Sequence, residues 1–204
     1  MKVLLTGASG FVGSKLAHVF GEHGAEVIAP SHAELDVTHR AATLRAVDAA
    51  APDAIVHAAI LNDPEVMARD KRAAWDAYVG ATRNLVDSGA HVVLVSTDWV
   101  FDGTQGPARE DEPPNPINQY GFLKAASELV VAERGTVARI AGVQGVHRAP
   151  RSQDYGFGYL VASVVAALRA DEPFTVWESP AINTLATPTL AGVAGELIWR
   201  ALET

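Results

Sequence analysis

The feature that most constrains the fold of this chain is a run of three glycines near its amino terminus. The run reads TGASGFVG and places Gly7, Gly10 and Gly13 at a GxxGxxG spacing. A short apolar stretch, Lys2–Thr6, precedes it and predicts a strand, and a helical pattern over Phe11–His23 follows it. A strand that turns through glycines directly into a helix is typical of the first unit of an α/β fold.

Each glycine of this turn has a distinct physical role. Gly7 permits a tight turn off the strand, Gly10 lets the backbone approach a pyrophosphate closely, and Gly13 lets the helix pack near the strand. The amino terminus of the helix then presents N–H groups and the positive end of the helix dipole to a phosphate. An ordinary structural turn is the alternative. The residues expected to bind a dinucleotide here are Gly7, Ser9, Gly10, Phe11, Val12 and Gly13.

Strand-like and helix-like stretches alternate along the rest of the chain. The apolar runs lack clean alternation with polar residues, which is typical of strands buried on both faces of a parallel sheet. We therefore expect an α/β fold, a doubly wound parallel sheet (Rossmann fold) with helices on both faces. The expected strands are Lys2–Thr6, Ala25–Pro30, Glu34–Val37, Ala54–Ala59, His91–Thr97, Thr136–Ala141 and Phe174–Glu178. The expected helices are Phe11–His23, His39–Ala49, Val66–Ser88, Gln119–Glu133, Gly156–Ala170 and Thr189–Leu202.

Two regions of the chain are expected to differ in role. Residues 1–142 are predicted to form an NAD(P)-binding Rossmann domain, and residues 143–204 part of a substrate cap with a helix that returns to that domain. Between the fifth and sixth strands, Asp102–Asn118 is rich in Gly, Pro and acidic residues and predicts a long loop. Loops of this length are usually functional or disordered.

Composition excludes several classes of function. The chain of 204 residues has no cysteine, which rules out disulfides, thiolate catalysis and cysteine-ligated zinc. Its net charge of −8 argues against a nucleic-acid partner. No pair of histidines has the i, i+4 spacing of a metal clamp, so no metal is expected. The absence of a long apolar run and of a signal-peptide pattern predicts a cytoplasmic protein with no membrane partner.

The GxxGxxG spacing resembles that of the extended short-chain dehydrogenases and reductases. In that family two further segments contact the adenosine half of the cofactor, and the matching residues of this chain are Asp36, Val37, Ala58, Ala59 and Ile60. Asp36 is equally compatible with the N-cap region of a helix. The neighbouring His57 is better interpreted as a hydrogen-bonded core histidine.

The choice between NAD(H) and NADP(H) depends on the end of the second strand. An acidic residue there would bind the ribose 2′-hydroxyl and favour NAD. This chain has Pro30, Ser31 and His32 instead, so no group is expected to repel a 2′-phosphate, and Ser31 and His32 can donate hydrogen bonds to it. NADP(H) is therefore favoured as the cofactor, with NAD(H) as the alternative.

A tyrosine and a lysine open the helix that follows the long loop. Their i, i+4 spacing puts Tyr120 and Lys124 on one helical face. A nearby ammonium favours the phenolate, so the pKa of Tyr120 is expected to fall toward the working pH, and the phenol can protonate a carbonyl oxygen while hydride arrives at the carbon. Thr97 ends the fifth strand, where open α/β sheets bind ligands, and its hydroxyl can hold the same carbonyl or simply cap the strand. Trp99 is equally compatible with the pocket wall and with the core.

These segments together are similar to the dTDP-4-dehydrorhamnose reductase family. The resemblance is carried by STDWVFDG at 96–103, by the acidic proline-rich loop, and by Pro116, Tyr120, Gly121, Lys124 and Glu128. That family reduces the 4-keto group of a nucleotide-linked 6-deoxy sugar with NADPH. The resemblance implies a catalytic set of Thr97, Tyr120 and Lys124, of which the last two also contact the cofactor. It further implies that Asp98 and Val100 lie near the sugar.

Three departures from the family pattern bear on function. The family usually has an asparagine in the long fourth helix, and this chain has Tyr78 there, which alters a water relay to Lys124. The strand after the catalytic helix usually ends in a tryptophan-bearing run that packs on the sugar, and Gly142 leaves that contact empty. The chain also stops at Thr204, before the further cap elements of family members, which indicates either a fragment or a substrate held by less protein.

Three functions stay open from the sequence. The leading one is an NADP-dependent reductase of the keto group of a nucleotide-linked deoxy sugar. A nucleotide-sugar epimerase or dehydratase that retains NAD shares the glycine turn and the tyrosine–lysine pair. A non-catalytic regulatory subunit that binds NADP and a partner enzyme, as in a related branch of the family, fits the changes at Tyr78 and Gly142. The expected partner is a small molecule, a nucleotide sugar, and a homodimer is left open.

Overall fold

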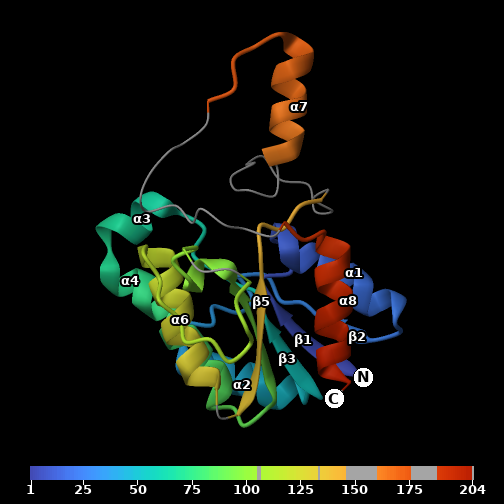
Figure 1. Ribbon diagram of the computed structural model, residues 1–204. Helices are drawn as coiled ribbons and strands as arrows, with labels where there is room; N and C mark the ends of the chain where they lie inside the picture. Colours follow the sequence, from blue (N-terminus) through green and yellow to red (C-terminus); the bar gives the residue numbers. More distant parts are fainter. Residues whose placement is uncertain (105–106, 133, 146–159, 176–187, 204) are drawn as a thin grey trace.

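Five parallel strands form the centre of the molecule (Figure 1). The structure, a computed structural model, describes residues 1–104, 107–132, 134–145, 160–175 and 188–203. The strands are β1 (Lys2–Thr6), β2 (Glu26–Ile28), β3 (Ala54–His57), β4 (Val92–Thr97) and β5 (Gly135–Ile140), in the order β2-β1-β3-β4-β5. Every neighbouring pair is parallel. The predicted parallel sheet is confirmed.

Apolar side chains on the two faces of this sheet build two halves of the core. Successive residues of a strand point to opposite faces, so Val3 and Leu5 of β1 belong to one apolar cluster and Leu4 to the other. The first cluster is covered by α1 (Phe11–Glu22) and α8 (Ala191–Leu202), the second by α2 (Arg40–Ala50), α5 (Ala81–Val86) and α6 (Gln119–Val131). Helices on both faces make the sheet doubly wound, as the sequence predicts.

The strand predicted over Glu34–Val37 is wrong, because this segment forms turns. The N–H groups of its first two residues donate to the carbonyl of Ser31, and the side chain of Asn84 donates to the carbonyl of Val37. These groups are therefore satisfied without a partner strand. The apolar residues that suggested a strand, Leu35 and Val37, are buried in the core beside α2 instead.

The single helix predicted over Val66–Ser88 is divided into shorter segments. Asp70 has φ −115° and ψ 87°, outside the helical region, and its carboxylate accepts a hydrogen bond from the N–H of Ala73. This residue therefore ends one helix and caps the next. The segments are α3 (Pro64–Arg69), α4 (Lys71–Trp75), a π-helical turn η1 (Asp76–Gly80) and α5. Short π-helical turns occur frequently at functional sites, and this one carries Tyr78.

The carboxy-terminal part of the chain is described in two segments. α7 (Leu160–Ala170) stands away from the sheet, whereas α8 lies along α1 (Figure 1). α8 confirms the helix predicted at the end of the chain. The strand predicted over Phe174–Glu178 does not form at residues 174–175, and residues 176–178 lie outside the described part, as do residues 156–159 at the predicted start of α7. Among the described helices, none is long and apolar enough to cross a membrane.

Candidate active site

The glycine turn joins the carboxyl end of β1 to α1 and is closely packed. Gly7 adopts a φ of +76°, and a Cβ there would lie 2.5 Å from the main-chain nitrogen of Ala59. A Cβ on Gly13 would lie 2.1 Å from the carbonyl oxygen of Gly7. The predicted roles of Gly7 in the turn and of Gly13 in helix packing are therefore confirmed. Gly10 is the N-cap of α1, so the positive end of the helix dipole lies at this turn.

The segment that follows β3 lies directly beside the glycine turn. The N–H of Ala59 donates to the hydroxyl of Thr6 at 3.4 Å, and that hydroxyl is 2.7 Å from Nδ1 of His57. His57 is 2% exposed, and burial lowers its pKa to about 3, so the imidazole is neutral. The interpretation of His57 as a hydrogen-bonded core histidine is confirmed. Ala58 and Ile60 flank Ala59 at the same edge, and Ile60 is exposed.

Two carboxylates lie in the turns between β2 and α2. Glu34 accepts hydrogen bonds from the N–H and the hydroxyl of Ser31, at 2.8 and 2.7 Å. Glu34 was not among the groups expected near Ser31 from the sequence. Asp36 accepts from the N–H and the hydroxyl of Thr38, at 2.9 and 2.7 Å, and lies 3.1 Å from Nδ1 of His39. Asp36 thus holds the turn before α2, while the Val37 side chain is buried.

The predicted catalytic hydroxyls meet at the carboxyl end of β4. Thr97 is the last residue of β4, is 6% exposed, and its hydroxyl accepts from the N–H of Trp99 and hydrogen-bonds with Tyr120. The rings of Tyr120 and Trp99 pack edge to face with centroids 5.9 Å apart. Trp99, which is only partly buried, therefore contacts the predicted acid. Gly121 makes this approach possible, since a Cβ there would lie 2.0 Å from the carbonyl oxygen of Trp99.

The third predicted catalytic residue, Lys124, is buried one helical turn after Tyr120. Its Nζ donates to the carbonyl of Val95 at 2.8 Å and lies 5.6 Å from the centroid of the Tyr78 ring. Burial lowers the pKa of Lys124 to about 8, and the charge of Glu128 acts in the opposite direction. The ammonium is thus held by a main-chain dipole and an aromatic face.

The pKa of Tyr120 rises, and the prediction that it falls is wrong. It rises to about 12, chiefly because of burial; the hydrogen bond with Thr97 acts to lower it, and the carboxylate of Asp98 acts to raise it. The ammonium of Lys124 does not reverse these effects because it is directed to other groups. The phenol is consequently protonated at neutral pH.

Tyr78 completes an aromatic wall around these residues. Its side chain is buried, its hydroxyl donates to the carbonyl of Leu61 at 3.2 Å, and its ring meets that of Tyr120 edge to face at 6.0 Å. Burial raises the pKa of the Tyr78 phenol, followed by the effect of Tyr120. The place that the family pattern gives to an asparagine thus holds a ring that packs against both the phenol and the ammonium.

An ion pair below the site was not predicted from the sequence. Glu128 of α6 accepts a hydrogen bond from the hydroxyl of Ser96 and pairs with Arg139 of β5, whose Nη2 lies 2.8 Å from Oε2. Arg139 also donates to the carbonyl of Glu112 at 3.3 Å and packs on the ring of Phe101 at 4.9 Å. The pair therefore joins β4, β5, α6 and the long loop. Glu128 belongs to the family motif, but nothing in the sequence identified its partner.

The two residues expected near a sugar differ in accessibility. The Asp98 carboxylate accepts hydrogen bonds from Thr97 and from the main chain of Trp99 and Gly142, and burial raises its pKa. The side chain of Val100 is fully buried, so it lies in the core rather than at a surface open to a ligand. Gly142 adopts a φ of +36°, which favours glycine.

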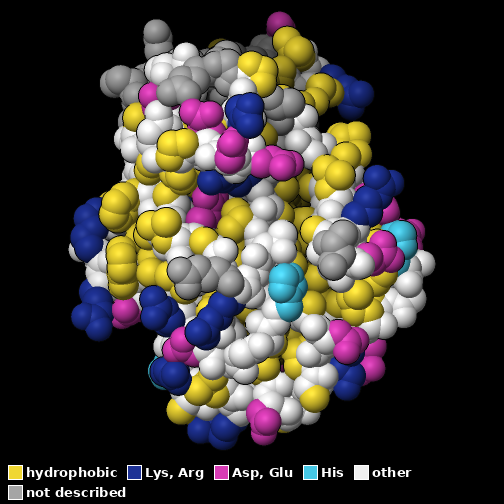
Figure 2. Space-filling view, turned by 60° about the horizontal axis from the view of Figure 1, so that its bottom comes forward, with side chains coloured by type: hydrophobic (Ala, Val, Ile, Leu, Met, Phe, Trp, Pro, Cys, Tyr) yellow, Lys and Arg dark blue, Asp and Glu magenta, His cyan; other side chains and the backbone are white. Residues whose placement is uncertain are grey.

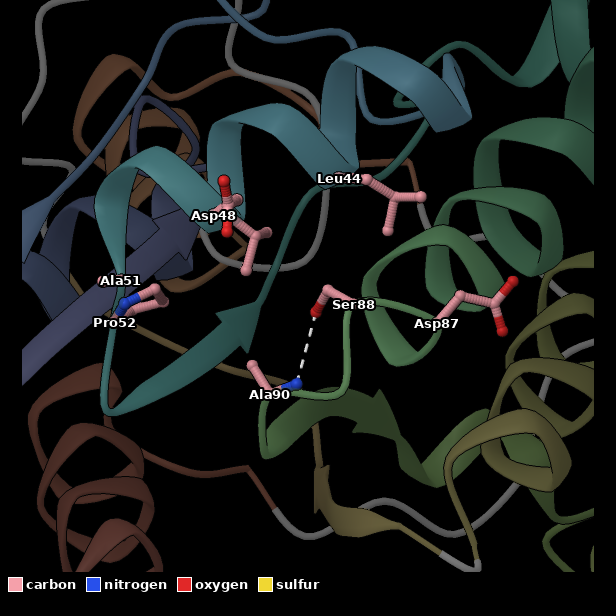
Figure 3. Close-up of a pocket in the computed structure, with 8 residues that line it drawn as sticks. Leu44, Asp48, Ala51, Pro52, Asp87, Ser88 and Ala90 are labelled. Atoms are coloured by element: carbon pink, nitrogen blue, oxygen red, sulfur yellow. Dashed lines mark hydrogen bonds between the residues drawn. The ribbon is translucent and has the colours of Figure 1, made fainter.

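One hollow of the surface lies apart from these groups. It has a volume of about 400 Å³ and is lined by residues of α2, by the end of α5 and by the turns that precede β3 and β4, including Asp48, Pro52 and Ala90 (Figure 3). It therefore lies at the amino edge of the sheet, opposite the glycine turn. Figure 2 shows Lys and Arg side chains interspersed with Asp and Glu over one face of the molecule. Within the described residues, no three His, Asp or Glu side chains gather to hold a metal ion.

Comparison with known proteins identifies the family. Residues 1–165 match the family described as the RmlD substrate binding domain. The chain belongs to the RmlD substrate-binding family. One RmlD-like relative, the dTDP-4-dehydrorhamnose reductase of Burkholderia thailandensis, is 36% identical over 143 residues, which are 66% of this chain and 47% of that protein. The methionine adenosyltransferase 2 subunit beta of Bos taurus is 31% identical over 150 residues, or 68% of this chain and 45% of that protein.

The chain thus spans about half the length of these curated relatives.

Solved structures share its fold over the full chain. The dTDP-4-dehydrorhamnose reductase of Clostridium acetobutylicum has a TM-score of 0.81 at 23% identity and is covered over 70% of its length. The Bacillus anthracis reductase in complex with NADP has a TM-score of 0.76 at 22% identity, covered over 71%. The Thermus thermophilus UDP-glucose 4-epimerase in complex with NAD has a TM-score of 0.81 at 22% identity, covered over 75%. The RmlD-like sequence resemblance is confirmed at the level of family and fold.

Proposed function

We propose that this chain carries the cofactor site and the catalytic residues of an NAD(P)-dependent reductase that acts on the keto group of a nucleotide-linked deoxy sugar. The observation that carries the proposal is the gathering of Thr97, Tyr120 and Lys124 at the carboxyl edge of the sheet, the edge that also carries the glycine turn. Ligands of open α/β sheets bind at this edge. Relatives named dTDP-4-dehydrorhamnose reductase support the substrate class.

The residues at this edge fit a nicotinamide dinucleotide. Gly7 and Gly13 leave no room for a Cβ, which keeps the main chain and the start of α1 accessible to a pyrophosphate. When bound, the cofactor supplies the hydride. We assign the pyrophosphate to Gly7, Ser9, Gly10, Phe11, Val12 and Gly13. We assign the adenosine half to Ser31, Asp36, Val37, Ala58, Ala59 and Ile60, and the nicotinamide half to Tyr120 and Lys124.

The catalytic residues handle the proton and the orientation of the substrate. Tyr120, with a pKa of about 12, holds its proton at neutral pH and donates it to the carbonyl oxygen as charge develops there. The hydroxyl of Thr97 hydrogen-bonds the same oxygen and fixes its position. The ammonium of Lys124, on the same helical face, favours the phenolate that the transfer leaves behind. Asp98 and the main chain around Val100 are our assignment for sugar contacts.

This assignment gives the two regions of the chain different functions. Residues 1–142 would form the NAD(P)-binding domain, and residues 143–204 would contribute part of the substrate cap. α8 belongs to the second region and packs against α1 of the first. The cap would exclude water from the reacting carbonyl.

Turnover of a keto sugar tests the proposal directly. Loss of absorbance of the reduced nicotinamide is measured when a dTDP-4-keto-6-deoxyhexose is added to the chain with NADPH or NADH. We expect Tyr120→Phe to lower kcat by at least about a hundredfold, because it removes the proton donor, while cofactor binding is retained. A wild-type chain that binds the cofactor but turns over no keto sugar would contradict the reductase assignment. Turnover without net consumption of cofactor would instead indicate an epimerase or dehydratase.

A cofactor-binding regulatory subunit is the second candidate. The relatives named methionine adenosyltransferase 2 subunit beta favour it, as does the Tyr78 ring at the place of the family asparagine. This candidate predicts a cofactor-loaded chain that is inert toward keto sugars and co-elutes with a methionine adenosyltransferase catalytic subunit in size-exclusion chromatography. The intact set of Thr97, Tyr120 and Lys124 argues for the enzyme.

A further inference from the structure

A carboxylate occupies the hydrogen-bond donors at the end of β2. One oxygen of Glu34, Oε2, accepts both the N–H of Ser31 at 2.8 Å and its hydroxyl at 2.7 Å. Ser31 follows β2 by three residues, and β2 pairs in parallel with β1, whose carboxyl end carries the glycine turn. Glu34 therefore lies on the same edge of the sheet as the proposed pyrophosphate site.

Through its hydrogen bonds to Ser31, Glu34 lies beside the position at which dinucleotide-binding folds discriminate between cofactors. In such folds an acidic residue about 20 residues beyond the glycine turn accepts the ribose 2′-hydroxyl, whereas a 2′-phosphate requires donors. Glu34 lies at about this spacing from Gly13. The hydrogen bonds from Ser31 lower the pKa of Glu34, so its carboxylate is charged at neutral pH.

Two basic residues that follow Glu34 in the chain pair with other carboxylates. Arg40, the first residue of α2, pairs with Asp87 at 2.9 Å. His39 pairs with Asp36 at 3.1 Å. The side chain of Ser31 is neutral. A 2′-phosphate at this place would compete with Glu34 for both donors of Ser31 and would meet a like charge.

We propose that Glu34 selects against the 2′-phosphate, so that this chain binds NAD(H) in preference to NADP(H). The inference rests on the proposed dinucleotide site and names its cofactor. Glu34 would act in two ways. Its second carboxylate oxygen, Oε1, would accept a hydrogen bond from the ribose 2′-hydroxyl. Its negative charge, and its hydrogen bonds to both donors of Ser31, would disfavour the binding of a phosphate. At this position the charge of Glu34 opposes the binding of NADP(H), the cofactor that the family resemblance implies.

Cofactor titration of matched variants tests the proposal. Binding of NADH and NADPH is measured by isothermal calorimetry on the wild-type chain, on Glu34→Gln and on Glu26→Gln. Glu26 is an exposed glutamate at the other end of the same strand, so its substitution controls for the loss of one negative charge. We expect the wild type to bind NADH more tightly, and Glu34→Gln to raise the affinity for NADPH about tenfold while that for NADH changes less than about threefold. Glu26→Gln should leave the ratio unchanged.

The salt dependence provides a second readout. Because Glu34 and the 2′-phosphate would interact through solvent-exposed charges, the gain in NADPH affinity should be larger at low ionic strength. Ser31→Ala in the Glu34→Gln background should remove part of that gain. A wild type that prefers NADPH, or a Glu34→Gln variant whose NADPH-to-NADH affinity ratio is unchanged, would overturn the inference while leaving the dinucleotide site in place. Absence of binding of either cofactor to every variant would overturn the proposed function as well.

Discussion

The buried charge of Lys124 is expected to set the pH range in which the site is active. Its ammonium is 3% exposed and is held by the carbonyl of Val95 and the ring of Tyr78. Burial brings the pKa of Lys124 down to about 8, so this group changes charge close to physiological pH, whereas Tyr120 stays protonated up to about 12. Above neutral pH, we therefore expect activity to be limited by the loss of the Lys124 charge and not by the loss of the Tyr120 proton.

The pH dependence of turnover follows from these two values. Lys124 is charged below about pH 8 and neutral above it, so reductase activity that depends on its charge should fall by about tenfold per pH unit above that point. The measurement is kcat/KM for the keto sugar between pH 6 and 10. Lys124→Met should lower activity over the whole range and abolish the alkaline decline. A wild-type profile that stays flat until about pH 10 would show that this charge is not required.

Residue chemistry was predictable from the sequence to different degrees. Thr97, Tyr120 and Lys124 come together as expected because strand ends and helix faces determine their placement. Glu34 was missed because a turn, which the sequence analysis took for a strand, brings it back onto Ser31. The pKa of Tyr120 was mispredicted because it depends on burial, which sequence spacing does not report.

At the scale of elements, the pair Glu128–Arg139 connects parts that are distant in sequence. Glu128 lies on α6 and Arg139 on β5, and their contacts reach β4 and the loop before α6. The glutamate side chain is 7% exposed and the arginine side chain 22%. Such a pair is partly shielded from water, so breaking it leaves a charge without a counterion.

Glu128→Gln should therefore lower the free energy of unfolding by about 2 kcal/mol, less than for a fully buried pair because Arg139 is partly exposed. Chemical denaturation measures this change. The matched control is Arg72→Gln, which breaks the exposed pair Arg72–Asp76 and should cost at most about 0.5 kcal/mol. Equal losses for the two variants would mean that the buried pair contributes no more than a surface pair.

Element boundaries were predicted well where apolar periodicity is regular and poorly where polar side chains end a helix. The strands and helices that cover the two faces of the sheet appear close to their expected positions. The single helix predicted over Val66–Ser88 failed because the carboxylate of Asp70 caps a second helix inside that pattern, after the helix that Asp63 caps. The Asp70 cap lies within a continuous helical apolar pattern, so periodicity alone does not reveal it.

For the whole molecule, the contact between α1 and α8 links the two ends of the described chain. Trp199 of α8 is 6% exposed, stacks on His23 with centroids 4.9 Å apart, and packs on Phe20 at 5.8 Å. His23 also lies 2.9 Å from the carboxylate of Glu196. These contacts complete the apolar cluster over one face of the sheet.

Trp199→Ala should lower the free energy of unfolding by about 3–5 kcal/mol, because it opens a cavity in that cluster. The control is Leu197→Ala on the exposed side of α8, where the leucine is 56% exposed and the loss should stay within about 0.5 kcal/mol. Both values come from urea denaturation of the chain. A Trp199→Ala variant as stable as Leu197→Ala would show that α8 adds little to the core.

The docking of α8 also has a consequence for the order in which the chain folds on the ribosome. Val3, Leu5 and Phe20 lie early in the chain, but α8, which covers their face together with α1, begins only at Ala191. Contacts between such distant segments form slowly and only after long loops close. During synthesis this side of the sheet is covered only in part, by α1, so the nascent domain exposes apolar surface until α8 is made, and chaperones would be needed most in that interval.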